Sequence, residues 1–121
     1  MDAASWISVH IYYHDGLDGL IDGAARPLVA ELRARALIDK HFFVRYWQGG
    51  PHLRLRLLPS AGVSEPLVAG ALDDTIAGFL RASPSRTVLR HRDYLQMAGP
   101  LAAVEPGQAV EPFEPNNAMR R

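Results

Sequence analysis

Two runs of alternating residues, separated by a Gly-Gly-Pro turn, constrain the fold of this chain most. Aromatic, aliphatic and basic residues follow one another from residue 41 to 47, and leucine alternates with histidine or arginine from residue 52 to 57. Alternation with a period of two is typical of strands that are buried on one face. The glycines between the runs can take positive φ angles, as tight turns require. The sequence therefore predicts a β-hairpin across residues 41–58.

The segments on either side of this hairpin predict two helices and two further strands. Residues 6–14 alternate in the same way and are expected to form a strand. Apolar residues then recur every three or four positions across residues 17–37, which indicates a helix that Pro27 kinks or restarts. Ser64 is expected to cap a second helix. Residues 87–95 are expected to form the fourth strand.

The resulting order of elements is β-α-β-β-α-β. This order is typical of the ferredoxin-like α+β fold, in which two helices cover one face of a four-stranded antiparallel sheet. We expect a single domain of this kind over residues 1–98. Residues 99–121 are rich in proline and glutamate without periodicity, and they are expected to form an extended tail or linker.

Composition excludes several classes of site and partner. The chain has no cysteine, which excludes disulfides, thiolate metal sites and a cysteine nucleophile. Thirteen basic and thirteen acidic residues cancel, so no overall charge favours nucleic acid or an anionic membrane. No apolar run is long enough to cross a membrane. We therefore expect a cytoplasmic protein that contacts neither membrane nor nucleic acid directly.

Metal binding is also not expected. His10 and His14 have a spacing that suits a metal pair on a helix, but on a strand they would lie about 13 Å apart. No other spacing in the chain indicates a metal or cofactor site, so none is predicted.

The period of the strands assigns side chains to the two faces of the expected sheet. The residues expected to face the helices are Ile7, Val9, Ile11, Phe42, Val44, Tyr46, Leu53, Leu55 and Leu57. The residues expected on the opposite, uncovered face are Ser8, His10, Tyr12, Phe43, Arg45, Trp47, His52, Arg54 and Arg56. Arginines on adjacent strands repel one another unless an anion lies among them. This pattern predicts an anion-binding platform with aromatic walls, and it fits equally a solvated face or an interface whose arginines pair with a partner's acids.

One histidine of the open face has two interpretations. His52 precedes Arg54 on that face, where it suits an acid or base beside an anion. It also suits a structural residue that closes the hairpin turn.

The hairpin carries a motif that resembles a known family. Residues 42–57 read FFVRYWQGGPHLRLRL, and residues 6–13 read WISVHIYY. Both resemble the lantibiotic dehydratase C-terminal domain, also called the thiopeptide-type bacteriocin biosynthesis domain, and the resemblance covers most of residues 5–95. It implies a role in the biosynthesis of ribosomally made peptide natural products. One branch of the family eliminates glutamate from glutamylated serine or threonine to leave a dehydroamino acid, and another closes the pyridine ring of thiopeptides by a formal cycloaddition.

The resemblance also implies roles for individual residues. In the eliminating branch, arginines surround the departing carboxylate and a histidine transfers a proton. By position in the motif, the candidate catalytic residues are Arg45, Arg54, Arg56 and His52. The candidate substrate-binding residues on the same face are His10, Tyr12, Phe43 and Trp47.

The expected partners follow from the same resemblance. They are a modified precursor peptide and either a complementing subunit or the larger dehydratase that glutamylates the peptide. Family members continue with a segment that holds further catalytic residues, so we expect lyase activity to need a second half or a partner chain, in a homo- or hetero-oligomer. The alternative is a non-catalytic half-domain that dimerises or docks a modifying enzyme or a precursor peptide.

Overall fold

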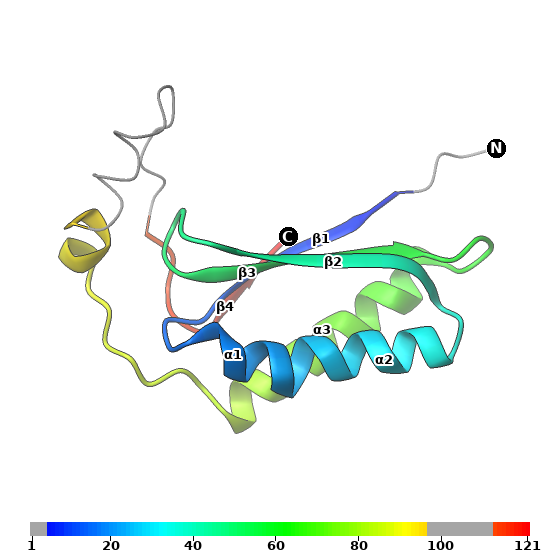
Figure 1. Ribbon diagram of the computed structural model, residues 1–121, viewed down its shortest axis with the longest axis horizontal. Coiled ribbons are helices and arrows are strands. Elements are labelled where there is room, and N and C mark those ends of the chain that lie inside the picture. Colours follow the sequence, from blue (N-terminus) through cyan, green and yellow to red (C-terminus); the bar gives the residue numbers. More distant parts are fainter. Residues whose placement is uncertain (1–4, 97–112) are drawn as a thin grey trace.

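A computed structural model describes residues 5–96 and 113–121 and confirms the α+β class. The four-stranded antiparallel sheet has the order β2-β3-β1-β4. Its strands are β1 (Ile7–Tyr12), β2 (Ile38–Tyr46), β3 (His52–Pro59) and β4 (Ala118–Arg120). Figure 1 shows the helices α1 to α3 on one face of this sheet, so that the opposite face carries none of them.

The first helical stretch is continuous but changes its winding. It consists of α1 (Leu17–Leu20), the π-helical η1 (Ile21–Ala25) and α2 (Arg26–Ala34). Pro27 lies in the first turn of α2, directly after the π-helical turn, and has no N–H to donate to that turn; the helix expected over residues 17–37 is present and changes its winding next to Pro27. Gly23 lies in the π-helical turn, where a Cβ atom would approach the Phe79 ring of the neighbouring helix to 2.6 Å. The absence of a side chain there lets the two helices pack closely.

The second helix begins where the sequence predicts. The α3 helix (Glu65–Ala82) follows Ser64, whose Oγ accepts a hydrogen bond from the Leu67 backbone N at 3.3 Å. Its fully buried face packs into the core beneath the sheet. The members of this face are Val68, Leu72 and Ile76.

The fourth strand comes from a part of the chain where none is predicted. Residues 87–90 have no regular structure and residues 91–96 are helical, so the prediction of a strand over 87–95 is wrong. One reason is Asp15, which accepts hydrogen bonds from the Arg86 and Thr87 backbone N atoms and holds that segment beyond the end of β1. The edge strand is β4, within residues assigned from the sequence to a tail. The boundary expected at residue 98 lies outside the described residues.

The assignment of faces is confirmed for β1 and β3 and is wrong for β2. Residues directly opposite each other in an antiparallel ladder share a face. Val44 pairs with Arg54, whereas Arg45 pairs with the fully buried Leu53. Phe42, Val44 and Tyr46 therefore lie on the open face, and Phe43 and Arg45 lie on the helix side. Apolar residues occupy odd-numbered and even-numbered positions of β2 alike, so composition does not tell which residues face the helices. The register through the turn determines this.

Candidate functional site

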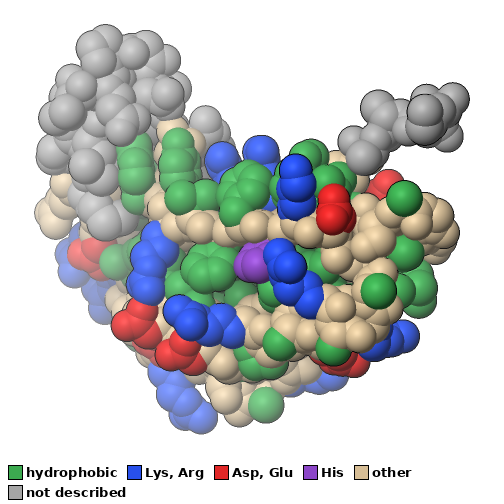
Figure 2. Space-filling view, turned by 45° about the vertical axis from the view of Figure 1, so that its right-hand side comes forward, with side chains coloured by type: hydrophobic (Ala, Val, Ile, Leu, Met, Phe, Trp, Pro, Cys, Tyr) green, Lys and Arg blue, Asp and Glu red, His purple; other side chains and the backbone are tan. Residues whose placement is uncertain are grey.

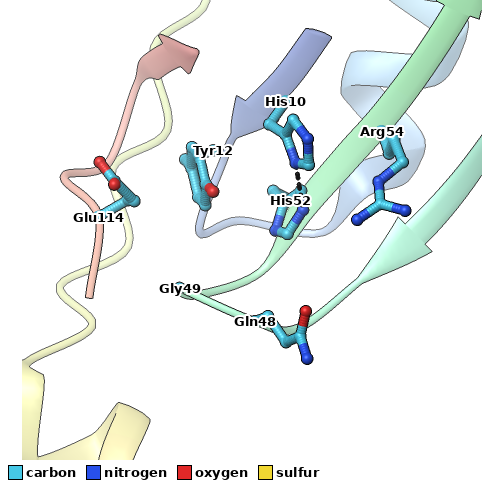
Figure 3. A pocket seen from close by; sticks show the side chains of 7 residues that line it. All are labelled: His10, Tyr12, Gln48, Gly49, His52, Arg54 and Glu114. Atoms are coloured by element: carbon cyan, nitrogen blue, oxygen red, sulfur yellow. Dashed lines mark hydrogen bonds between the residues drawn. The ribbon is translucent and has the colours of Figure 1, made fainter. Parts of the chain in front are cut away.

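The open face is hollowed where β1 and β3 meet the turn between β2 and β3. The hollow has a volume of about 260 Å³. Figure 3 shows its lining residues, which are His10, Tyr12, Gln48, Gly49, His52, Arg54 and Glu114. They come from β1, the turn, β3 and the segment before β4, so the sheet order brings distant parts of the sequence to one place.

Two histidines in this hollow are hydrogen bonded to each other. His10 Nδ1 lies 3.0 Å from His52 Nε2, and His52 Nδ1 lies 3.0 Å from the Gly50 carbonyl oxygen. The rings of Tyr12 and Tyr46 pack against His52, with centroid distances of 4.6 and 5.6 Å. His52 is 1% exposed. Both of its ring nitrogens are therefore occupied, and its orientation is fixed.

The environment of both imidazoles favours their uncharged form. Burial lowers the pKa of His10, and the positive charges of Arg54 and Arg56 lower it further. Burial also lowers the pKa of His52; the Gly50 carbonyl opposes this change, while His10 and Arg54 add to it. A neutral imidazole has a lone pair that can accept a proton, so the hollow contains a base.

Arginines extend from this histidine pair along β3. The guanidinium carbon of Arg54 lies 4.7 Å from the Tyr46 ring centroid, and that of Arg56 lies 5.6 Å from the Phe42 ring centroid. Within residues 5–96 and 113–121, neither Nε atom has a hydrogen-bond partner, and both are buried. Stacking on a ring leaves the edge of a guanidinium to bind a planar anion such as a carboxylate. Figure 2 shows basic side chains on both sides of a histidine on one face of the molecule.

The C-terminal segment forms another wall of the hollow. The Glu114 backbone N donates a hydrogen bond to the Gly49 carbonyl oxygen at 2.7 Å. Glu114 Oε2 lies 3.2 Å from Arg120 Nε. Sequence reasoning missed both residues of this ion pair because their segment has no periodicity. The Asn116-Asn117 pair was the available signal, since asparagine favours turns and a turn would return the chain to the sheet.

The structure separates the eight predicted site residues into three groups. His10, Tyr12, His52 and Arg54 line the hollow, and Arg56 follows Arg54 on the same face. Phe43 and Arg45 lie on the other face, so the expectation that they share a surface with Arg54 is wrong. Phe43 packs against the core, and Arg45 forms an ion pair with Asp18 of α1. Trp47 lies in the turn, outside the residues that line the hollow.

Two further properties of the described residues bear on function. They contain no group of three or more histidine, cysteine, aspartate or glutamate residues placed to hold a metal ion. His14 lies apart from His10 and stacks on Phe113 at a centroid distance of 5.2 Å. Among the helices of the described ranges, none is both long and apolar enough to cross a membrane.

The buried histidines predict that stability depends on pH. Burial lowers the pKa of His10, His14 and His52 below the ordinary value of 6.5, so just below that pH the unfolded chain binds protons that the folded chain does not. We expect the unfolding free energy to be highest above pH 6.5 and to fall as the pH decreases toward the lowered values. Urea unfolding between about pH 8 and about pH 5.5 measures this slope. The variant His14→Phe keeps an aromatic ring against Phe113 and should give a shallower slope, whereas a free energy independent of pH would contradict the prediction.

Comparison with known proteins relates this geometry to one family. Residues 6–105 match the family described as lantibiotic biosynthesis dehydratase C-term. Among solved structures, the pyridine synthase TbtD from thiomuracin biosynthesis is similar, with a TM-score of 0.75 and 31% sequence identity over 95% of this chain. The chain covers 38% of TbtD and thus spans well under half of that protein. No curated protein sequence matches the chain.

Proposed function

This chain belongs to the lantibiotic dehydratase C-terminal family, and from that membership and the geometry of the hollow we propose that it eliminates glutamate from a glutamylated serine or threonine of a precursor peptide. The family and the similarity to a thiomuracin enzyme support a role in peptide natural product biosynthesis. The observation that carries the finer proposal is a hydrogen-bonded pair of imidazoles beside Arg54. Elimination needs a base and a carboxylate-binding group at the same place, and the imidazole pair and Arg54 suit these two roles.

The reaction needs one proton transfer and the departure of one carboxylate. An imidazole takes the proton from Cα of the modified residue. The electrons of that C–H bond form the Cα=Cβ double bond, the Cβ–O bond breaks, and glutamate leaves with a new carboxylate. The products are a dehydroamino acid, free glutamate and a protonated imidazole, so atoms and charge balance.

Arg54 is suited to the departing carboxylate. Negative charge develops on the ester oxygens as the Cβ–O bond breaks, and a preorganised cation stabilises that charge more than it stabilises the neutral ester. Arg54 lies in the hollow, and within the described parts of the chain no aspartate or glutamate forms an ion pair with it. Its guanidinium is stacked on Tyr46, which fixes its orientation.

A second candidate reaction is ring closure between dehydroamino acids. It is favoured by the similarity to TbtD, whose name describes a pyridine synthase, at 31% identity. Ring closure would use the same open face to bind a peptide that has already been dehydrated. The two candidates therefore differ in substrate rather than in the surface that binds it.

We further propose that further polypeptide, in the same protein or in a partner subunit, completes the site. None of the helices α1 to α3 covers the face of the sheet that carries the hollow, and the chain covers 38% of the similar synthase. A complementing subunit, or the dehydratase that glutamylates the peptide, would cover the face that carries Arg54 and Arg56. The alternative is a non-catalytic domain that docks the precursor peptide on this face.

Two synthetic peptides test the proposal. One carries an O-glutamyl serine, and the other carries two dehydroalanines. With the complementing subunit, or the dehydratase that glutamylates the peptide, added, we expect the chain to release glutamate from the first peptide faster than buffer does, with dehydroalanine detected by mass spectrometry. A new ring in the second peptide without glutamate release would establish the second candidate instead. Binding of either peptide without any turnover would favour the docking alternative, and the absence of binding would contradict all three.

A further inference from the structure

The hydrogen bonds of the histidine pair assign different roles to its two members. We infer that His10 Nε2 is the atom that accepts the substrate proton, and that His52 is a positioning residue that fixes the tautomer of His10. This inference rests on the proposed elimination and identifies its base. The sequence favours the opposite assignment, because His52 is the histidine within the arginine motif.

The tautomer of His52 follows from its backbone contact. A carbonyl oxygen can only accept a hydrogen bond, so the proton lies on His52 Nδ1, 3.0 Å from the Gly50 oxygen. In the neutral ring, Nε2 then has the lone pair. This atom is buried against His10 and has no access to a substrate.

The tautomer of His10 follows from that of His52. Since His52 Nε2 accepts, His10 Nδ1 must donate across the 3.0 Å contact. The lone pair of neutral His10 is therefore on Nε2. Within the described residues, this nitrogen has no hydrogen-bond partner, and His10 is only partly buried in the wall of the hollow. It is the ring nitrogen of the pair that a substrate can reach.

The pair can hold one additional proton but not two. Protonation of both rings would place two N–H groups against each other at 3.0 Å. A proton taken at His10 Nε2 can be balanced by a shift of the shared proton toward His52 Nε2, so the charge spreads over both rings. Arg54 of β3 opposes its retention, because it is paired with His10 in the sheet register and its positive charge lowers the pKa of His10.

The other side chains near His10 also affect whether it keeps a proton. Arg56 of β3 adds positive charge, and Glu114 is engaged with Arg120 through the ion pair at 3.2 Å. Tyr12 packs on the His52 ring. The net surroundings are positive, which favours a neutral base before the reaction and release of the proton after it.

Imidazole ¹⁵N chemical shifts of the full chain, recorded near neutral pH with a metal chelator, test the assignment without any substrate. We expect both rings to be neutral Nδ1–H tautomers, although free histidine in water favours Nε2–H. The variant His52→Phe keeps a ring in the packing but has no acceptor, and it should convert His10 mainly to Nε2–H. His52→Gln restores an acceptor and should restore the Nδ1–H form. His41→Gln is the matched control and should leave the shifts of the pair unchanged, because His41 contacts Arg33 instead.

The outcomes separate this inference from the proposed function. An Nε2–H tautomer of His10 in the unsubstituted chain, or shifts that ignore both His52 variants, would overturn the positioning role. Shifts that change on chelation would show a shared metal ion in place of the hydrogen bond and would also overturn it. If the tautomers are as expected, His10→Gln should slow elimination roughly 100-fold or more, and an unchanged rate would overturn the assignment of the base. If the unsubstituted chain eliminates nothing even with its complementing polypeptide present, the proposed function fails while the tautomer result stands.

Discussion

Replacing Asn117 with alanine is expected to release β4 from the sheet and to lower the unfolding free energy by about 3 kcal/mol. Asn117 Oδ1 accepts a hydrogen bond from the Ser85 backbone N at 2.7 Å, and Asn117 Nδ2 donates to the Ser85 carbonyl oxygen at 3.1 Å. Ser85 is buried, so the loss of one of these partners leaves a backbone group unsatisfied. Asn117 also has a φ of 61°, a left-handed conformation that asparagine tolerates better than alanine does.

Two variants separate the causes of this loss. Asn117→Gly removes the same hydrogen bonds but accepts the positive φ, so we expect it to be less destabilised than Asn117→Ala by about 1 kcal/mol. Urea unfolding gives the free energies, and amide hydrogen exchange of residues 118–120 reports whether β4 opens locally. Exchange in β4 as slow as in the unsubstituted chain would contradict the proposed anchoring.

Periodicity predicts the long elements of this fold because each of them has one buried face. In β3, Leu53, Leu55 and Leu57 are fully buried and alternate with more polar residues, which fixes the orientation of the strand. The β2 strand lacks that contrast, because Phe42 is 41% exposed and Phe43 packs against the core. Its orientation depends on the register through the turn, and a register shifted by one residue would reverse both faces.

The candidate site is predictable only in part for the same physical reason. His10, His52 and Arg54 lie on half-buried strands, so alternation places them on one face. The contact between the two histidines depends on the pairing of β1 with β3, which alternation does not determine. Glu114 and Arg120 belong to a segment whose strand has three residues, too few to show a period of two. Hydrogen bonds from Asn117, rather than an apolar pattern, hold that segment in place.

Removal of the Arg54 guanidinium is expected to have the largest effect on activity. We expect Arg54→Ala to slow glutamate elimination by roughly 100-fold or more, because the carboxylate would then form in the hollow without its cation. Arg54→Lys keeps a positive charge but lacks the planar fork, so it should recover only part of the rate. The loss of stacking on Tyr46 should cost about 1 kcal/mol of stability, which leaves the variant folded and makes the rate interpretable.

Arg45→Ala is the matched control for this substitution. The sequence motif places Arg45 in the same group as Arg54, but the sheet register puts it on the helix side, where it pairs with Asp18. The exposed pair contributes little to stability, so the variant should fold and should eliminate glutamate at close to the unsubstituted rate. Initial rates of glutamate release from the glutamylated peptide compare the three variants directly. Equal losses in Arg45→Ala and Arg54→Ala would mean that the two faces of the sheet do not divide the arginines by function, whereas a loss confined to Arg54 identifies the open face as the reacting one.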